Sequence, residues 1–335
     1  MATTHRSASS PQGILRALTF LIPWSLHLLL ANLLLTLTLV PSLFIPLQTY
    51  AFNSQIAYSV WKAIQNLFER KRGARISFSG DPLPQHENAL VVANHVSWTD
   101  FYLIQAVAAR AGMLGSSRYF AKSQLKWVPL LGWGLVAMGM PMVTRDWTSD
   151  RREFQALFEG IKNGGWPICK LLPPIRTKTW PLLNRFSGLI AYSESTRFTQ
   201  KKWEETREFL SSRGKSALPY VLYPRTKGFV AAVQSLRNDS QIKHVYDLTL
   251  AYSRAGKGGF MSAPTIWESF AFARVSPPWK FHVHIRRFEL KDLPEDEEGV
   301  RDWLEGRWAE KSKILQGMEG EWTEFEGLGE LIDYQ

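Results

Sequence analysis

The strongest hydrophobic pattern in the chain is a long apolar stretch near the N-terminus. No Asp, Glu, Lys or Arg occurs between Arg16 and Lys62, and residues 18–47 are mostly apolar. A helix needs roughly 20 apolar residues to cross the hydrocarbon core of a membrane, and this stretch is long enough. A cleaved signal peptide has a shorter apolar core and a small-residue cleavage site. The pattern therefore favours a membrane anchor at residues 17–50, preceded by a tail at residues 1–16.

Prolines divide this stretch at Pro23, Pro41 and Pro46. Because proline lacks a backbone N–H, it tends to kink or end a helix. Two arrangements remain open: one spanning helix followed by an interfacial one, or a re-entrant hairpin whose backbone is covered by protein.

After the anchor the hydrophobic period changes from four residues to short runs. Residues 52–70 have an apolar side chain at every fourth position, which predicts an amphipathic helix. Short apolar runs bounded by turn residues then predict strands. These are Leu90–Ala93, Tyr119–Ala121, Met142–Val143, Leu189–Tyr192, Tyr220–Tyr223, Val245–Tyr252 and Lys280–Phe288. Helical patterns at residues 101–111 and 151–163 alternate with them, so we expect an α/β domain at residues 51–290.

The C-terminal part has two further patterns. Residues 281–287 alternate apolar and polar side chains, which predicts a strand with one exposed face carrying His282 and His284. We interpret these as surface histidines, because no third metal ligand accompanies them. Residues 291–335 then begin with acidic side chains followed by one apolar stripe, which predicts an acidic helix and tail.

Composition narrows the class of protein. The chain has 335 residues, 45% hydrophobic and 21% charged, and its single cysteine, Cys169, excludes an intrachain disulfide and a cysteine-clustered metal site. Residues 291–335 carry 14 acidic and 5 basic side chains, against 16 acidic and 35 basic in the rest. A basic body attracts nucleic acid, anionic membranes or phosphate-bearing small molecules. The anchor and the lack of a recognised binding motif argue against nucleic acid.

His95 and Asp100 are the first candidates for chemistry. The predicted strand that ends at Ala93 leads into His95, and a predicted helix follows, so both residues lie at a strand-to-helix junction that faces the ligand crevice of an α/β sheet. A carboxylate that holds one imidazole nitrogen lets the other accept a proton. On a regular helix this spacing would separate the two side chains, whereas a turn at the helix start could join them. Alone, the pair is more often a structural histidine beside a helix-capping aspartate.

Four ordered blocks give this pair its context. The first, residues 94–100, reads Asn-His-x4-Asp. The second runs from residue 122 to 145, the third is Glu-Ser-Thr-Arg-Phe at 194–198, and the fourth contains Pro-Arg-Thr-Lys-Gly at 224–228. In order and spacing these blocks resemble the glycerophospholipid acyltransferase superfamily. The resemblance is strongest to its eukaryotic branch of lysophosphatidic acid and lysocardiolipin acyltransferases.

The resemblance implies a fold and a reaction. The fold is a glycerolipid acyltransferase domain with a mixed sheet flanked by helices, preceded by an N-terminal membrane helix or hairpin. The reaction is that of a 1-acylglycerol-3-phosphate O-acyltransferase-like enzyme, which moves a fatty acyl group from acyl-CoA to a hydroxyl of lysophosphatidic acid, or of a lysocardiolipin- or lysophosphatidylinositol-like acceptor. His95 is then the general base and Asp100 orients it. No metal, cofactor or acyl-enzyme is implied, acyl-CoA being a co-substrate. The substrates and membrane lipids are the expected partners, and protein partners are unknown.

The resemblance also assigns binding roles. The residues for the acceptor phosphate are Glu194, Arg197, Arg145 and Lys122, and those for the acyl-CoA cleft are Pro224, Arg225 and Gly228. Arg197 is the first choice, with Glu194 as its positioning partner, because a guanidinium offers a planar fork of donors that matches phosphate oxygens. Arg145 is the second choice.

Two departures from the family pattern bear on function. Ser195 replaces the usual glycine of the third block. Residues 170–190 are the second departure, because resembling sequences pass almost directly from the segment before this stretch to the third block. This stretch is either a surface insertion or translated non-coding sequence, and messenger RNA read across it would decide between them. The alternative function is an inactive membrane-bound relative that binds lipid or a partner protein. The expected location is the endoplasmic reticulum membrane, with a mitochondrial membrane as the alternative.

Overall fold

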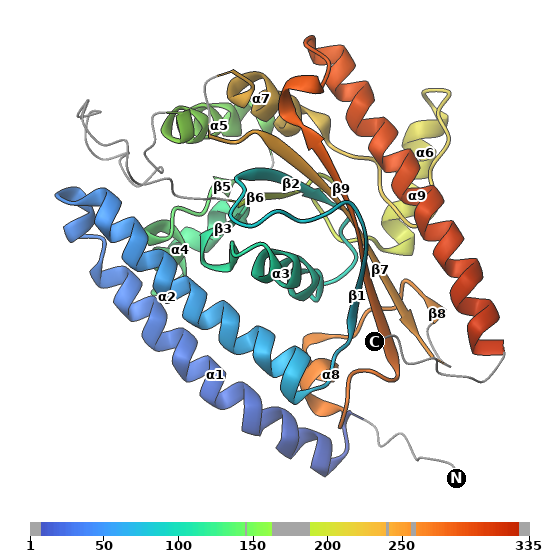
Figure 1. Ribbon diagram of the computed structural model, residues 1–335, viewed down its shortest axis with the longest axis horizontal. Helices are drawn as coiled ribbons and strands as arrows, with labels where there is room; N and C mark the ends of the chain where they lie inside the picture. Colours follow the sequence, from blue (N-terminus) through green and yellow to red (C-terminus); the bar gives the residue numbers. More distant parts are fainter. Residues whose placement is uncertain (1–7, 145, 163–187, 239–240, 256–258, 328–335) are drawn as a thin grey trace.

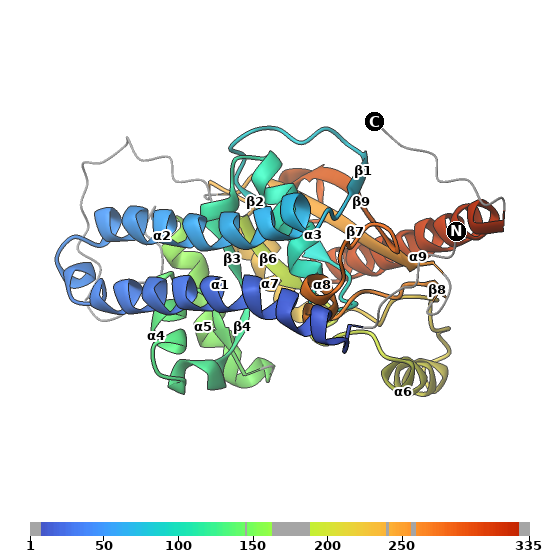
Figure 2. The same ribbon diagram turned by 90° about the horizontal axis from the view of Figure 1, so that it is seen from below.

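The N-terminal apolar stretch forms two long helices. The computed structural model describes residues 8–144, 146–162, 188–238, 241–255 and 259–327. Helix α1 (Pro11–Leu37) and helix α2 (Pro46–Asn66) lie side by side in opposite directions, joined through the short helix η1 (Pro41–Leu43) (Figures 1 and 2). Pro23 lies inside α1 without ending it, and Pro46 opens α2, where its missing N–H costs no hydrogen bond. The structure thus has a helical hairpin, and α1 begins within the segment expected to be a tail.

Helix α1 lies along the body of the protein. It contacts α2, α4 (Leu131–Ala137) and α8 (Ile266–Ala271). A Cβ on Gly134 of α4 would come within 2.1 Å of Asn32 Oδ1, so these two helices approach closely because residue 134 is glycine. The other face of α1 is apolar and exposed. By length and composition α1 is able to cross a membrane, although it lies near the N-terminus, where a signal sequence would meet the same criteria.

Behind the hairpin lies a mixed sheet. Among the described residues its strands are β1 (Ile76–Gly80), β2 (Ala89–Ala93), β3 (Ser117–Tyr119), β6 (Gly188–Tyr192), β7 (His244–Arg254), β8 (Gly259–Phe260) and β9 (Trp279–Glu289). Their order is β1-β9-β7-β2-β6-β3, with β8 paired to β7. Strands β7, β2, β6 and β3 are parallel, whereas β9 is antiparallel to β7. The α/β fold with a mixed sheet is confirmed.

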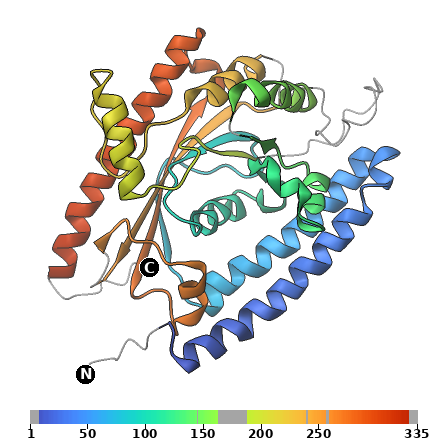
Figure 3. The same ribbon diagram turned by 180° about the vertical axis from the view of Figure 1, so that it is seen from behind.

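Helices cover both faces of this sheet (Figures 1 and 3). One face carries the hairpin, α3 (Asp100–Arg110) and α8, and the other carries α5 (Trp147–Lys162), α7 (Thr226–Leu236) and α9 (Glu297–Gly327). Strand β2 is buried on both faces and is accordingly apolar throughout, whereas the equally buried β7 also carries polar side chains, among them Asp247 and Thr249. The remaining elements are short: α6 (Gln200–Ser211), the β4–β5 pair (Ala121–Lys122 and Met142–Val143), the π-helical turn η2 (Leu67–Lys71), η3 (Leu114–Ser116), η4 (Ser123–Trp127) and η6 (Leu290–Asp292).

One predicted strand is wrong, and two observed strands, β1 and the two-residue β8, were not predicted. Residues 220–223 form a turn and loop, because Tyr220 has φ of 64° and prolines at 219 and 224 cannot donate to a strand ladder. Strand β1 was missed, since only Ile76 and Phe78 of its residues are large and apolar and its pairing partner is β9, far along the chain. The predicted one-sided strand is β9, whose residues alternate between buried and partly exposed from Trp279 to Ile285.

Two predicted features fall partly outside the described residues. Of the interrupting stretch at residues 170–190, residues 170–187 are not described, and the last three belong to β6. Cys169 also lies outside the described part of the chain.

Candidate active site

His95 and Asp100 meet at the carboxyl end of β2. The loop after Ala93 carries His95, and Asp100 is the first residue of α3. The Nδ1 atom of His95 lies 2.7 Å from Oδ2 of Asp100. Turn geometry produces this contact, because the same carboxylate accepts hydrogen bonds from the backbone N–H groups of Val96 (2.7 Å) and Ser97 (3.1 Å).

The carboxylate of Asp100 is fully buried and has a further donor. The hydroxyl of Tyr252, from β7, donates to Oδ1 at 2.7 Å. These charge-assisted hydrogen bonds compensate for removing the carboxylate from water. Because an ionised carboxylate only accepts hydrogen bonds, Nδ1 of His95 carries the hydrogen and Nε2 keeps its lone pair. The arrangement therefore yields an imidazole whose Nε2 is able to take a proton.

The imidazole is also held by its ring face and by its backbone. Tyr192, the last residue of β6, stacks on His95 with ring centroids 4.1 Å apart. Asn94 joins the end of β2 to β7 through hydrogen bonds with the backbone of Leu250, of 3.0 Å to its C=O and 2.8 Å from its N–H. Burial raises the pKa of the Tyr192 hydroxyl far above its usual range, so this ring stays neutral beside the site.

Glu194 binds the backbone of His95 from the neighbouring loop. It is buried in the loop after β6, where Oε2 accepts from the backbone N–H of His95 at 3.3 Å and Oε1 accepts from Trp308 Nε1 of α9 at 3.1 Å. Burial raises the pKa of Glu194 to about 8. Arg197 is exposed, and within the described residues it forms no ion pair with Glu194. Glu194 thus contacts the histidine loop and α9 instead of its predicted arginine partner.

Helix α9 makes a second buried contact one turn further on. Lys311 Nζ donates to the carboxylate of Asp247 and, at 2.7 Å, to the carbonyl of Leu248, both on β7. Burial lowers the pKa of Lys311, and Asp247 opposes that shift. Trp308 and Lys311 therefore fix α9 to the loop after β6, which carries Glu194, and to β7, which carries Tyr252.

A cavity of about 1010 Å³ opens in front of the histidine. His95, 20% of whose side chain is exposed, lines it together with Tyr192 and Glu194. Its cationic side chains are Lys122, Lys202, Arg213, Arg225 and Lys227, and its acidic ones besides Glu194 are Asp146, Asp150 and Glu205. Among the described residues no cluster of His, Cys, Asp or Glu is arranged to hold a metal ion.

Most of the predicted binding residues reach this cavity. Lys122, Glu194, Pro224, Arg225 and Gly228 line it. The exposed Arg197 is not among the lining residues, and Arg145 lies outside the described part of the chain.

Ser195, the departure from the family glycine, lines the cavity with φ of 58°. Such a positive φ is a left-handed conformation that costs a residue with a Cβ more than it costs glycine. The structure therefore gives the reason why glycine suits this position. The neighbouring Thr196 hydroxyl accepts a hydrogen bond from Lys202 of α6.

Sequence reasoning missed Tyr192, Tyr252 and Trp308. The two tyrosines could have been found, because Tyr192 ends β6, Tyr252 lies two residues before the end of β7, and parallel strands direct their carboxyl ends to one edge of the sheet. Trp308 had no such signal, since it is one of several apolar residues on the face of a long helix and only the fold brings it to Glu194.

Comparison with known proteins identifies related sequences. The Acyltransferase family model matches residues 75–253, and the Acyltransferase C-terminus model matches residues 275–317. Mouse 1-acyl-sn-glycerol-3-phosphate acyltransferase epsilon is 28% identical over 303 residues, which is 89% of this chain and 73% of that protein. The mouse delta and human gamma forms are 30% and 29% identical over 270 and 268 residues, each covering 79% of this chain and 63% of the relative.

The crystal structure of the 1-acyl-sn-glycerophosphate (LPA) acyltransferase PlsC from Thermotoga maritima aligns with 85% of this chain and 96% of that one, at 18% identity and a TM-score of 0.42. The chain spans less than two thirds of the delta and gamma relatives. The Acyltransferase model alone, however, covers more than half of the chain and all four sequence blocks. The chain therefore belongs to the glycerophospholipid acyltransferase family, the family of the 1-acyl-sn-glycerol-3-phosphate acyltransferases.

Proposed function

We propose that this protein transfers a fatty acyl group from acyl-CoA to the free hydroxyl of lysophosphatidic acid, with His95 as general base. The observation that carries the proposal is the 2.7 Å contact between His95 Nδ1 and Asp100 Oδ2 at the wall of a cavity large enough for lipid substrates. The matched relatives bear the name 1-acyl-sn-glycerol-3-phosphate acyltransferase, which supports this acceptor.

The reaction follows from the free lone pair on Nε2. That nitrogen takes the proton of the acceptor hydroxyl while the oxygen attacks the thioester carbonyl carbon of acyl-CoA. The tetrahedral intermediate then collapses, the carbon–sulfur bond breaks, and the imidazolium returns its proton to the departing thiolate. The buried carboxylate of Asp100 stabilises the imidazolium between these two steps. Because the acceptor oxygen attacks the thioester directly, no acyl-enzyme is needed.

We propose that Lys122 and Arg225 bind the acceptor phosphate, which moves Arg225 from the acyl-CoA cleft, the role that the resemblance implied, to the acceptor. Both are exposed cations that line the cavity, one on β4 and one directly before α7. A phosphate offers several oxygens to such charge-assisted donors. Arg197 keeps its role from the sequence as a prediction, although its side chain does not line the cavity.

We also propose that the exposed apolar face of α1 lies in a membrane, from which the acceptor is drawn. Leu15, Leu26 and Leu37 are 68%, 61% and 62% exposed, and such a row of apolar side chains is costly in water. An endoplasmic reticulum membrane is the location we propose, and fractionation of the tagged protein against mitochondrial markers tests it.

The function is tested by acyl transfer from labelled acyl-CoA in membranes that carry the wild-type protein or its His95→Ala variant. We expect transfer to lysophosphatidic acid in the wild type and a loss of about 10²- to 10⁴-fold in the variant, because the general base is removed. Lysocardiolipin and lysophosphatidylinositol complete the acceptor panel. Absence of transfer to every acceptor by folded wild-type protein would support the alternative of an inactive, lipid-binding relative.

A further inference from the structure

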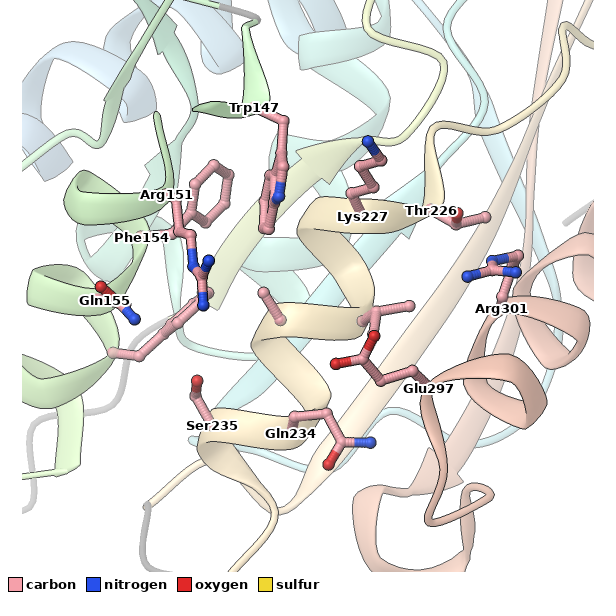
Figure 4. A pocket seen from close by; sticks show the side chains of 13 residues that line it. Trp147, Arg151, Phe154, Gln155, Thr226, Lys227, Gln234, Ser235, Glu297 and Arg301 are labelled. Atoms are coloured by element: carbon pink, nitrogen blue, oxygen red, sulfur yellow. The ribbon is translucent and has the colours of Figure 1, made fainter. Parts of the chain in front are cut away.

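A second cavity adjoins the catalytic one. It has a volume of about 370 Å³ and lies between α5, α7 and the first turns of α9. Figure 4 shows Trp147, Arg151 and Phe154 on one side of α7, and Glu297 and Arg301 on the other. Residues that line both cavities are Trp147, Phe154, Thr226 and Lys227. The two cavities therefore adjoin at these four residues, and a long ligand that passes between them would occupy both.

An aromatic row leads from one cavity to the other. Phe120, which lines only the catalytic cavity, has its ring centroid 5.2 Å from that of Phe154. Phe154 is in turn 5.7 Å from Trp147, with the rings tilted by 46°. Such a row offers an apolar wall to a thin, mostly apolar arm and ends on a large flat ring on which a nucleobase is able to stack.

The rim of the second cavity is mainly cationic. Arg151, Lys227 and Arg301 face a single acid, Glu297. All three cations are exposed, and in the part of the chain that the structure describes Arg151 and Arg301 form no ion pair, whereas Lys227 interacts electrostatically with Asp146. Cations without a carboxylate partner on a cavity rim attract an anion with several oxygens, because no existing ion pair has to be broken.

The position of this cavity separates it from the lipid side of the molecule. Helices α5, α7 and α9 cover one face of the sheet, and the apolar hairpin covers the other. A ligand whose polar, phosphate-bearing end binds in this cavity therefore has that end directed away from α1. The acceptor has its apolar chain beside its phosphate, whereas an acyl-CoA places its nucleotide at the far end of a long arm from the thioester.

We propose that this second cavity, which we call the nucleotide groove, binds the phosphorylated adenosine end of the acyl-CoA donor. Trp147 stacks on the adenine, Arg151 and Arg301 bind the phosphates, and the Phe120–Phe154 row contacts the arm that carries the thioester to His95. The inference rests on the proposed function, since it requires a CoA thioester as donor.

The test compares two donors. Acyl-CoA carries the nucleotide, and the matching acyl-pantetheine thioester has the same reacting group and arm without it. In the Arg151→Gln/Arg301→Gln protein we expect KM for acyl-CoA to rise about tenfold, from weaker phosphate contacts, while kcat and KM for lysophosphatidic acid stay within twofold of wild type. Activity on acyl-pantetheine should equal that of the wild type. Lys313→Glu, on an exposed residue of α9 that lines neither cavity, is the control and should match wild type with both donors.

The outcomes distinguish failure of the nucleotide groove from failure of the proposed function. If the double variant has an unchanged KM for acyl-CoA, or loses as much activity on acyl-pantetheine as on acyl-CoA, the nucleotide groove is wrong. The proposed function is unaffected by either result. A rise confined to the KM of lysophosphatidic acid also overturns the nucleotide groove and assigns the cavity to the acceptor headgroup. Adenosine 3′,5′-bisphosphate should inhibit competitively against acyl-CoA, and more weakly in the double variant. Wild-type protein that uses neither donor contradicts the proposed function itself.

Discussion

At the scale of single residues, Asp100 shows how distant parts of the chain meet at one carboxylate. Its donors come from the turn that precedes α3, from the imidazole of His95 and from Tyr252 on β7, which is 152 positions away. The local donors fix where the carboxylate lies, and the distant one ties it to the sheet. A charge held by several donors in a buried position has little freedom, so the imidazole that it orients has little freedom either.

Ser195 gives a prediction about backbone strain. Because its φ is 58°, Ser195→Gly should match or exceed the wild type in thermal stability, since relief of left-handed strain offsets the added freedom of the unfolded chain. Ser195→Val should destabilise by about 1–2 kcal/mol, because a β-branched residue tolerates this conformation least. Thermal unfolding in detergent measures the order. A valine variant as stable as the wild type would contradict the strained backbone.

Glu194 gives a prediction about pH. Burial raises its pKa from 4.5 to about 8, so between these pH values folded protein holds a proton that the unfolded chain has released. Stability from this group is therefore lost as pH rises from about 4.5 through 8. We expect the melting temperature of wild type to fall more between pH 5.5 and 8.5 than that of Glu194→Gln, which cannot titrate.

The control for this experiment is Glu208→Gln, an exposed residue of α6, which should follow the wild type. Parallel melting curves for all three proteins across this pH range would show that Glu194 does not hold its proton in the folded state.

At the scale of elements, α9 holds in place the loop that carries His95. Its Trp308 donates to Glu194, which accepts from the backbone of His95, and its Lys311 is bound to β7. A helix that lies far along the chain thus sets the position of His95, the proposed general base, through hydrogen bonds with buried groups. Buried polar groups of this kind are costly to leave without a partner.

We therefore predict that Trp308→Phe lowers kcat several-fold with little change in either KM. The phenyl ring keeps most of the packing but cannot donate, so Glu194 loses one of its hydrogen bonds. Trp303→Phe is the matched control, because Trp303 is on the same helix and packs on Phe229 by stacking. Equal kcat values in the two variants would argue against a positioning role for Trp308.

At the scale of the whole molecule, exposed apolar side chains lie on two elements that contact each other, α1 and the η4–α4 segment. Besides α1, the η4–α4 segment exposes Trp127 (78%), Trp133 (44%) and Val136 (43%). Amphipathic indole rings are typical of membrane interfaces, and the exposure of these two tryptophans favours such a role.

A double substitution tests this surface. In Trp127→Glu/Trp133→Glu we expect activity on long-chain lysophosphatidic acid in lipid vesicles to fall about tenfold, while activity on a short-chain, water-soluble acceptor stays within twofold of wild type. Carboxylates at the interface oppose insertion, but they leave the His95 site untouched. Lys313→Glu serves as the charge control on α9. Equal losses on both acceptors would instead indicate damage to the fold.

Most of the architecture could be read along the chain, because local rules govern it. Hydrophobic period alone predicts the apolar stretch at residues 18–47, the helix at residues 52–70, and the buried strands β2, β6 and β7. The stretch at residues 220–223 was misread because its apolar side chains, Val221 and Leu222, are buried in a turn instead of a strand. Strand β1 was missed because only its pairing with β9 makes it a strand.

The sequence by itself determined the apolar N-terminal stretch, the fold class and the His95–Asp100 pair, since spacing and motif order are properties of the chain. Tertiary structure alone decided which groups surround that pair: Tyr192 and Tyr252 from neighbouring strands, Glu194 turned inward to α9, and Arg197 left at the surface. The reason is physical. Local sequence sets the direction in which a strand or helix runs, but the partners of a buried polar group are set by which elements the whole sheet brings together, and that depends on every strand at once.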